Sequence, residues 1–352
     1  MQLNLPLFKK VSETPGAPGF EQRIRRLIIE EIKPFVDHIE VDHIGNLIAV
    51  KYGAKKPKDE KKIMVAAHMD ELGLIVKYID QDGFIRFHTL GGFDPKSLIG
   101  QRVIIHGKQD LTGVIGIKAI HFMTEEERKR PLEISDLYID IGRSQQQAMT
   151  YISIGDPITR ERGLIELGNC VTGKSLDNRT GVFVLIEALR TLQEVPYDAY
   201  AVFTVQEEVG LRGAQVAAHH IEPYFSLALD TSTSLDVPNV QPHDRVAKLG
   251  DGAGIKIMDG HTICDYRMVD YLKTIAIQHN IAWQTDIKSV GGTDTAPLQR
   301  MPKKGAIAGA LSIPIRYAHQ VVEVVHQADV ISAIQLLQEA LVGLDTYDWS
   351  HA

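Results

Sequence analysis

The sequence predicts an α/β protein in which a mixed, mostly parallel sheet is flanked by helices and carries an inserted all-β barrel. Short, wholly apolar runs such as residues 63–67 are typical of strands buried on both faces of a parallel sheet. In the second half of the chain such runs alternate with segments of helical periodicity. Between residues 72 and 160, β-like runs punctuated by glycines replace that alternation. We therefore expect a discontinuous domain of residues 1–70 and 161–352, interrupted by a β-rich domain of residues 71–160.

The composition describes an ordinary globular chain and excludes several classes of protein. Its 352 residues carry a net charge of −7 and are 44% hydrophobic, so we expect a large core and no nucleic-acid partner. No apolar run approaches the roughly 20 residues of a membrane span, and the chain starts without the apolar core of a secretion signal, which predicts a cytoplasmic protein. Two cysteines, Cys170 and Cys264, support neither a disulfide framework nor a thiolate zinc site. Any metal must therefore be held by histidine, aspartate and glutamate.

The amino-terminal segment is expected to form two helices, a hairpin and the first buried strand. Helical spacing within residues 3–36 is interrupted by a break rich in proline and glycine. Gly45 and Asn46 separate two short β-like runs and predict the hairpin turn. Residues 57–62 are charged and are expected to form a solvated loop. The first buried strand then ends at His68.

The remaining elements are predicted in the same way, from helical spacing of apolar residues and from short β-like runs. The insert combines short β-like runs with one short helix, and the segment after it alternates helices with strands. In the insert, strands are expected at 74–79, 84–88, 102–106, 114–117 and 138–141, with a helix at 124–130. In the later segment, helices are expected at 178–192, 212–220, 269–279 and 331–341, and strands at 199–205, 225–229 and 283–287.

Polar side chains lie where several of the buried strands end, and one lies just before a helix. Ligands of open α/β sheets bind at the carboxyl ends of the strands. We therefore expect these imidazoles and carboxylates to meet at one edge of the sheet. The residues are His68, Asp70, Asp177, Glu207, Glu208, Asp230 and His319.

Each of these residues taken alone also fits a purely structural role. Asp177 suits a helix N-cap, Asp230 an Asx turn, and a histidine after a strand is usually a satisfied structural residue. Taken together, however, the carboxylates would repel one another at one sheet edge unless cations held them. Two divalent ions would resolve that conflict.

The order of these motifs resembles that of one peptidase family, the dinuclear-metal aminopeptidases that build tetrahedral dodecamers. The family includes glutamyl, leucyl and deblocking aminopeptidases and proteins named glucanase M. The resemblance covers nearly the whole chain, insert included, and implies a zinc-exopeptidase-like fold. It is carried by His68-x-Asp70, Ser175-Leu176-Asp177-Asn178-Arg179, Glu207-Glu208-Val209-Gly210, Asp230-Thr231-Ser232, Gly291-Gly292-Thr293-Asp294 and Arg316-Tyr317-x-His319.

The resemblance implies two divalent cations per subunit, held by five side chains. His68 and Asp230 would hold one ion, Glu208 and His319 the other, and Asp177 would bridge both through its two carboxylate oxygens. Such a set accepts zinc or cobalt, with manganese as an alternative. The family also implies a cis peptide bond after the bridging aspartate.

The resemblance further implies hydrolysis of the first peptide bond of a peptide. Glu207 would be the general base, which takes a proton from the attacking water and delivers it to the leaving amine. Asp70 would accept the second ring N–H of His68 and fix its tautomer. An acidic site attracts the cationic α-amine, so the expected partners are short peptides with a free N-terminus.

The family also implies assembly through the β insert. The insert would pair subunits into dimers, and the dimers would form the edges of a dodecamer that encloses the active sites. A closed, symmetric homo-oligomer is the common expectation for soluble assemblies. The sequence alone leaves a dimer or a monomer open.

A few positions depart from the family pattern or have two interpretations. The run Thr295-Ala296-Pro297 stands where the family usually has Ala-Gly, and Gln320 stands where serine is common; both are expected near the substrate pocket. His121, in the insert, is either a substrate contact or an ordinary loop histidine. Asp294 is expected to anchor its loop, with substrate contact as the alternative. The preferred first residue of the substrate is not predicted.

Three other functions stay open on the sequence. A glucanase-type polysaccharide hydrolase usually needs an aromatic-lined cleft beside its acid/base pair, whereas only 7% of the residues here are aromatic. A non-enzymatic shell protein would be expected to have lost a metal ligand or Glu207, and none is lost. A deblocking or deacylating metallohydrolase would use nearly the same chemistry as an aminopeptidase.

Overall fold

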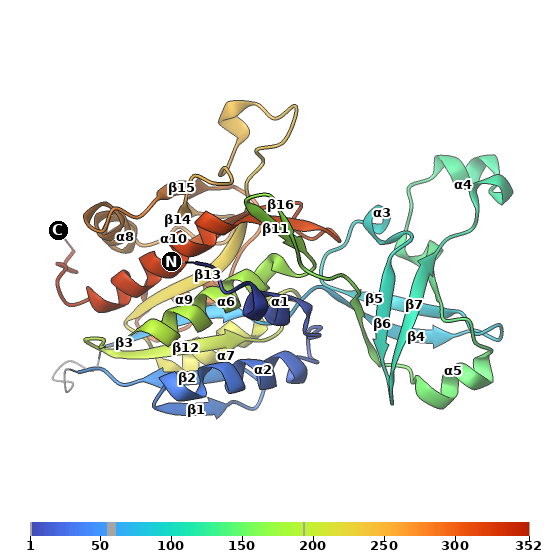
Figure 1. The fold of residues 1–352 in the computed structure, drawn as a ribbon, viewed down its shortest axis with the longest axis horizontal. Coiled ribbons are helices and arrows are strands. Elements are labelled where there is room, and N and C mark those ends of the chain that lie inside the picture. The colour runs from blue at the N-terminus through green and yellow to red at the C-terminus, as the bar shows by residue number, and fades with distance from the viewer. Residues whose placement is uncertain (1, 55–60, 193, 352) are drawn as a thin grey trace.

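The computed structural model describes residues 2–54, 61–192 and 194–351 and has the predicted α/β fold with an inserted β barrel (Figure 1). Residues 57–60 of the predicted charged loop lie outside the described ranges. Helices cover the main sheet, and the barrel stands at one side of that domain. Along the sheet the strands are β1 (His38–Val41), β2 (Leu47–Lys51), β12 (Asp198–Thr204), β3 (Lys62–His68), β13 (Phe225–Thr233), β16 (Ile307–Arg316), β17 (Glu323–His326), β11 (Cys170–Gly173) and β10 (Ile165–Leu167), with β14 (Ala253–Met258) and β15 (Trp283–Ile287) joined to β16.

The central strands run parallel, which brings their carboxyl ends to one side of the sheet. β12 and β13 flank β3, and β16 follows β13, all in parallel register. Thr204 pairs with His68, and Ala228 pairs with Ala66, so Asp230 lies level with His68. The parallel topology therefore brings the polar residues at the ends of these strands to the same edge of the sheet.

Strand β3 is buried on both faces, as its apolar run predicts. Ile63, Val65 and Ala67 belong to the core that α1, α2, α6, α8 and α10 cover, whereas Met64 and Ala66 pack with α7 and α9 on the opposite face. No helix in the described ranges is long and apolar enough to cross a bilayer. The helices of this domain are α1 (Leu5–Glu13), α2 (Gln22–Ile32), α6 (Leu176–Thr191), α7 (Arg212–Ile221), α8 (Tyr266–Gln278), α9 (Thr295–Arg300) and α10 (Gln327–Val342).

The insert closes into a barrel with a hydrophobic core of its own. Leu74, Ile105, Ile139 and Ile158 are buried in that core, which forms a cluster separate from those of the main sheet. The closed strand order is β4 (Gly73–Ile79), β5 (Ile85–Leu90), β8 (Tyr138–Asp140), β7 (Asp110–Gly116), β6 (Arg102–His106) and β9 (Pro157–Arg160). It also carries three short α-helices, α3 (Pro95–Leu98), α4 (Glu125–Lys129) and α5 (Gln145–Tyr151), and two 3-10 helices, Ile120–Phe122 and Ile134–Asp136.

The sequence misses several short elements and places some helix starts late. It does not predict β9, β10, β11, β14 or β17, nor α3, α5 and α9, because these segments are too short or too mixed in polarity to show a period. Helix α8 begins at Tyr266, where Asp265 caps it, rather than at 269. Helix α10 begins at Gln327 rather than at 331, because its first turn is polar.

A buried ion pair joins the outer strands β14 and β15, and we expect it to contribute to the free energy of unfolding. Lys256 Nζ on β14 lies 2.9 Å from Asp286 Oδ2 on β15, and both side chains are fully buried. Asp286→Asn would leave the ammonium in the core without its counter-charge, so we expect the free energy of unfolding to fall by about 3–5 kcal/mol in denaturant titrations. The control is Asp251→Asn at the exposed pair with Lys248, which should cost less than about 1 kcal/mol. Equal losses in the two variants would contradict the prediction.

Candidate metal centre

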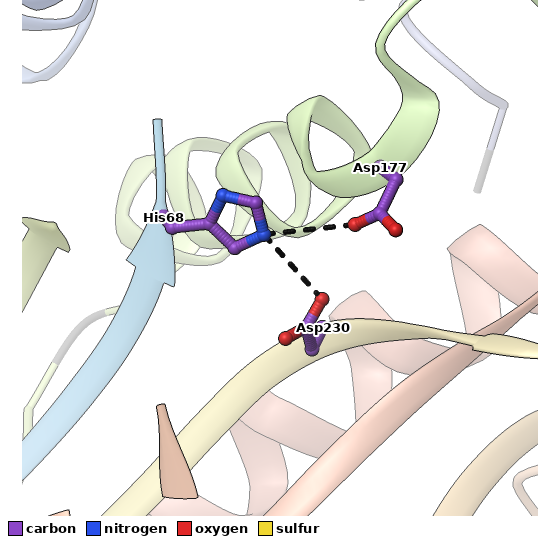
Figure 2. A group of neighbouring side chains, drawn as sticks. All are labelled: His68, Asp177 and Asp230. Atoms are coloured by element: carbon purple, nitrogen blue, oxygen red, sulfur yellow. Dashed lines mark ion pairs between the residues drawn. The ribbon is translucent and has the colours of Figure 1, made fainter. Parts of the chain in front are cut away.

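His68 lies at the middle of a first group of ligand-type side chains (Figure 2). Its Nε2 is 3.6 Å from Asp177 Oδ1 and 3.7 Å from Asp230 Oδ1. The three residues come from the end of β3, the start of α6 and β13. Their ligand-type atoms lie within 4.8 Å of one another, which is close enough for one cation to contact all three.

A second group shares Asp177 with the first. His319 Nε2 lies 3.5 Å from Asp177 Oδ2 and 3.7 Å from Glu208 Oε2. These ligand-type atoms also lie within 4.8 Å of one another. The two oxygens of Asp177 therefore face different imidazoles, one in each group. All five residues proposed as ligands from the sequence are brought together.

The start of α6 holds Asp177 outside regular helix geometry. Ser175 has a φ of 59°, Asp177 and Asn178 have non-helical dihedral angles, and the peptide bond between them is cis, as the family resemblance implies. Asn178 Nδ2 donates a hydrogen bond to the Leu229 carbonyl at 2.7 Å. This bond ties the turn to β13, one residue before Asp230.

Asp70 lies beside the second ring nitrogen of His68 and also contacts the turn after β12. The nearest acceptor to His68 Nδ1 is the main-chain oxygen of Asp70 at 3.2 Å, and the nearer carboxylate oxygen is 3.5 Å away. The Asp70 carboxylate instead accepts the backbone N–H groups of Glu207 and Glu208, each at 3.1 Å. The carbonyl is thus the closer partner of the imidazole, and the carboxylate fixes the turn that carries both glutamates.

Glu207 lies beside the first group and outside both ligand sets. Its Oε2 is 3.9 Å from His68 Nε2. Burial raises the pKa of Glu207 well above its usual range, and the charge of Asp230 adds to this rise against the opposing effect of His68. A carboxyl group with a raised pKa can take up and release a proton near neutral pH, which is the property of a general base.

The other ionisable groups of the site shift one another's pKa values. Burial raises the pKa of Glu208 to about 8, and the contact with Asp177 raises the pKa of His319 to about 9. Burial acts against ionisation of Asp177, but His319 and His68 outweigh it and lower the pKa of that carboxyl. A divalent cation would replace these protons, because metal ligands bind in their deprotonated forms.

The donor atoms fit divalent cations in both chemistry and spacing. Zinc binds imidazole nitrogen and carboxylate oxygen at about 2.0–2.2 Å in tetrahedral sites, so two ligand atoms lie about 3.3 Å apart. The four separations of 3.5–3.7 Å are close to that value and longer than ordinary hydrogen bonds. In addition, Glu208 Oε1 is buried without a hydrogen-bond partner among the described residues. A cation would satisfy this oxygen.

A cavity of about 590 Å³ opens over the two groups. Gly291, Gly292 and Thr293 line part of its wall, but Thr295-Ala296-Pro297 forms the buried start of α9 and does not line it. Gln320 is likewise absent from the lining residues. The two departures from the family pattern therefore lie close in the chain to wall residues, Thr293 and His319, but do not line the wall themselves.

Neither of the two residues left with alternative roles lines the cavity. His121 is exposed on the barrel in the short helix Ile120–Phe122, and it does not line the cavity. Asp294 is buried, and its carboxylate accepts a hydrogen bond from Thr204 Oγ1 at 2.6 Å. Within this chain, the structure favours the role of an ordinary loop histidine for His121 and that of a loop anchor for Asp294.

Sequence reasoning missed a buried carboxylate that contacts the backbone of two candidate ligands. Glu323, the first residue of β17, accepts the N–H of Asp177 at 3.1 Å and the N–H of His319 at 3.2 Å. The only sequence signal is its position as a single acid within a run of valines, 321–325. A charged residue in such a run predicts burial with a partner but does not name the partner.

The pKa shifts of His319 and Glu208 predict how the stability of chelator-treated protein depends on pH. The pKa of His319 rises from 6.5 to about 9 on folding and that of Glu208 from 4.5 to about 8, so the folded state holds more protons between pH 6.5 and 8. The melting temperature should therefore fall as the pH rises through this window. Excess zinc should weaken the fall, since bound ligands are already deprotonated. A metal-free melting temperature that rises from pH 6.5 to 8 would refute the assignment.

Comparison with known proteins shows which family this chain belongs to. The model of the M42 glutamyl aminopeptidases matches residues 45–336. The chain is 42% identical to the Acetivibrio thermocellus protein named "Putative aminopeptidase", covering 95% of this chain and 97% of the relative. It is 32% identical to the lysyl aminopeptidase of Pyrococcus furiosus, covering 98% of each.

Several solved structures have the same fold as this chain over nearly its whole length. An aminopeptidase of Desulfurococcus kamchatkensis has a TM-score of 0.91 at 36% identity, covering 96% of this chain and 94% of that one. The Pyrococcus horikoshii TET1 peptidase, which can assemble into a tetrahedron or a large octahedral shell, has a TM-score of 0.85 at 35% identity, covering 96% and 98%. A Thermotoga maritima protein named endoglucanase has a TM-score of 0.78 at 31% identity, covering 95% and 96%. The chain belongs to the M42 aminopeptidase family and is a metalloaminopeptidase, an enzyme that hydrolyses peptide bonds.

Proposed function

We propose that this enzyme removes N-terminal residues from short peptides by a water attack that two divalent cations and Glu207 support. The observation that carries the proposal is the placement of Asp177, whose two oxygens face the imidazoles of His68 and His319. His68, Asp177 and Asp230 would hold one cation, and Asp177, Glu208 and His319 the other. Zinc or cobalt suits these ligands, with manganese as an alternative.

Glu207 is the proposed general base of the reaction. Bound cations would polarise the scissile carbonyl and make the attacking water more acidic. Glu207 is buried next to the first ligand group and outside both sets, so its carboxylate is free to take the proton of the water. The same carboxyl would then deliver that proton to the nitrogen of the leaving amine. Asp70 supports this role because it fixes the backbone N–H of Glu207 at 3.1 Å.

The cavity supports a peptide substrate better than a polysaccharide. None of its lining residues is Phe, Tyr or Trp, so it lacks the stacking surfaces that sugar-binding clefts usually have. Its floor is instead acidic, which favours the cationic amine of a peptide N-terminus. A deblocking or deacylating hydrolase remains the second candidate, since it would use the same groups.

We also propose that the chain forms a homo-oligomer through its barrel, up to the dodecamer that the family resemblance implies. Two large apolar side chains of the barrel support this, because Ile120 and Phe122 are 63% and 78% exposed. The tetrahedral and octahedral assemblies of the TET1 peptidase favour the same conclusion. The cytoplasm stays the predicted location.

The role of Glu207 is tested by Glu207→Gln. The variant should keep its bound metal, because Glu207 is outside both ligand sets, but should lose at least about 100-fold in kcat, because the amide cannot take a proton. Metal content by elemental analysis and rates on aminoacyl-p-nitroanilides measure the two effects. Glu208→Gln is the matched control and should lose metal together with activity. Near-normal turnover of Glu207→Gln, or cleavage of β-glucan but of no aminoacyl substrate by the metal-loaded enzyme, would overturn the proposal.

A positively charged side chain in the cavity wall, that of Lys288, suggests which first residue of the substrate the enzyme prefers. Lys288 lines the cavity and is the only Lys or Arg of the described ranges that does so. Among the described residues its ammonium group has no hydrogen bond or ion pair. A Cβ added at Gly291 would lie 3.7 Å from Lys288 Nζ, so the ammonium lies beside a glycine turn that also lines the cavity. An acidic side chain at the first position of the substrate would complement this charge.

Lys288→Met tests this preference while keeping the length of the side chain. We expect kcat/KM for a glutamyl p-nitroanilide to fall about tenfold, the value of one charge-assisted hydrogen bond, and kcat/KM for the leucyl compound to stay within about twofold. Lys248→Met, at an exposed lysine paired with Asp251, serves as the control. Equal losses on both substrates would contradict a role for Lys288 in side-chain recognition.

A further inference from the structure

A single buried carboxylate lies between the two segments that carry Asp177 and His319. Strand β17 runs between β16 and β11 in the sheet. Its first residue, Glu323, pairs with Gly173 at the end of β11, four residues before Asp177. On its other side, the turn from β16 to β17 carries His319. Glu323 is fully buried at the junction of these two connections.

Both oxygens of Glu323 are occupied by backbone donors of candidate ligands. Oε2 accepts the N–H of Asp177 at 3.1 Å, and Oε1 accepts the N–H of His319 at 3.2 Å. Each oxygen therefore fixes one residue of the second ligand group. A carboxylate is required for this arrangement, because an amide would offer one acceptor oxygen and would turn its NH₂ group toward the other donor.

His319 depends on this contact more than Asp177 does. Its side chain is 46% exposed, and its φ of 63° places it in the left-handed region that non-glycine residues rarely adopt. Asp177 has further support, because the next residue, Asn178, is bonded to Leu229 on β13. Removing the carboxylate should therefore release the imidazole of His319 first.

We propose that Glu323 is a positioning residue that sets the second cation site by fixing the backbone of His319 and Asp177 at once. The inference rests on the proposed metal pair. It assigns to Glu323 no contact with substrate and no part in proton transfer. It predicts that loss of Glu323 impairs the group of Asp177, Glu208 and His319 and spares the group of His68, Asp177 and Asp230.

The chain contains a matched control for the chemistry of such a carboxylate. Asp329, on α10, is also buried and also accepts two backbone N–H groups, those of Gly250 and Gly252, each at 2.8 Å. Neither glycine belongs to the ligand groups or lines the cavity. Glu323→Gln and Asp329→Asn therefore remove the same kind of interaction at two places, only one of which contacts candidate ligands.

The test titrates Co²⁺ into chelator-treated full-length protein, followed by calorimetry and by the visible spectrum of the bound ion. The wild-type chain and Asp329→Asn should bind two ions with the same spectrum. Glu323→Gln should bind one ion with wild-type affinity and the second at least tenfold more weakly, with an altered spectrum at the second equivalent. If Glu323→Gln does not fold, Glu323→Asp, which keeps the charge but shortens the reach, should show the same selective loss.

The outcomes separate this inference from the proposed function. A wild-type chain that binds no Co²⁺ would refute the metal pair itself. If wild type and Glu323→Gln bind two ions with the same affinities, only the role of Glu323 is refuted and the metal pair stands. Equal loss of the second ion in Glu323→Gln and Asp329→Asn would also refute it, because the effect would then be a general loss of stability.

Discussion

The arrangement of the site follows from one constraint, the repulsion among carboxylates buried at a single edge of the sheet. Asp177, Glu207, Glu208 and Asp230 line one cavity, and two imidazoles are their nearest basic partners. So much buried negative charge is tolerated only with protons or cations to balance it. The raised pKa of Glu208 and the lowered pKa of Asp177 are two results of the same competition. A divalent cation in each group would relieve that competition without moving the backbone.

The fold meets this constraint by fixing the main chain of the ligand-bearing segments rather than their side chains alone. Asp70 holds the turn of Glu207 and Glu208 through two N–H groups, and Glu323 holds Asp177 and His319 in the same manner. The barrel adds to this support. A Cβ at Gly91 would lie 3.3 Å from Glu208 Cβ, and Arg160 at the end of β9 donates to the carbonyl of Gln320, next to His319. The insert therefore packs against the second ligand group in addition to any role in assembly.

The sequence predicts the parts of the site that lie at the ends of strands, since an apolar run marks where such a strand stops. His68 and Asp230 were placed in this way, and the alternation of runs predicted the fold. The family resemblance was needed to assign roles, because spacing along the chain does not say which side chains meet. Glu323 and Thr204 were missed for the same reason: their partners Asp177 and Asp294 come from distant parts of the chain. The two backbone N–H donors of the Asp70 carboxylate were also missed, because they come from Glu207 and Glu208, which follow β12 far along the chain.

The candidate metal ligands and Lys288 lie on different parts of the sheet, and this bears on how one family can serve different substrates. Most of the candidate ligands lie at or just after the ends of β3, β12, β13 and β16, the buried parallel strands, so a change there would disturb these side chains and the core together. Lys288, by contrast, follows β15, an outer strand that pairs only with β14 within the described sheet. Substitutions in that wall can change the charge that faces the first residue of a peptide while leaving the ligand backbone intact. A lysyl aminopeptidase at 32% identity can therefore share this fold with a chain whose cavity carries a lysine.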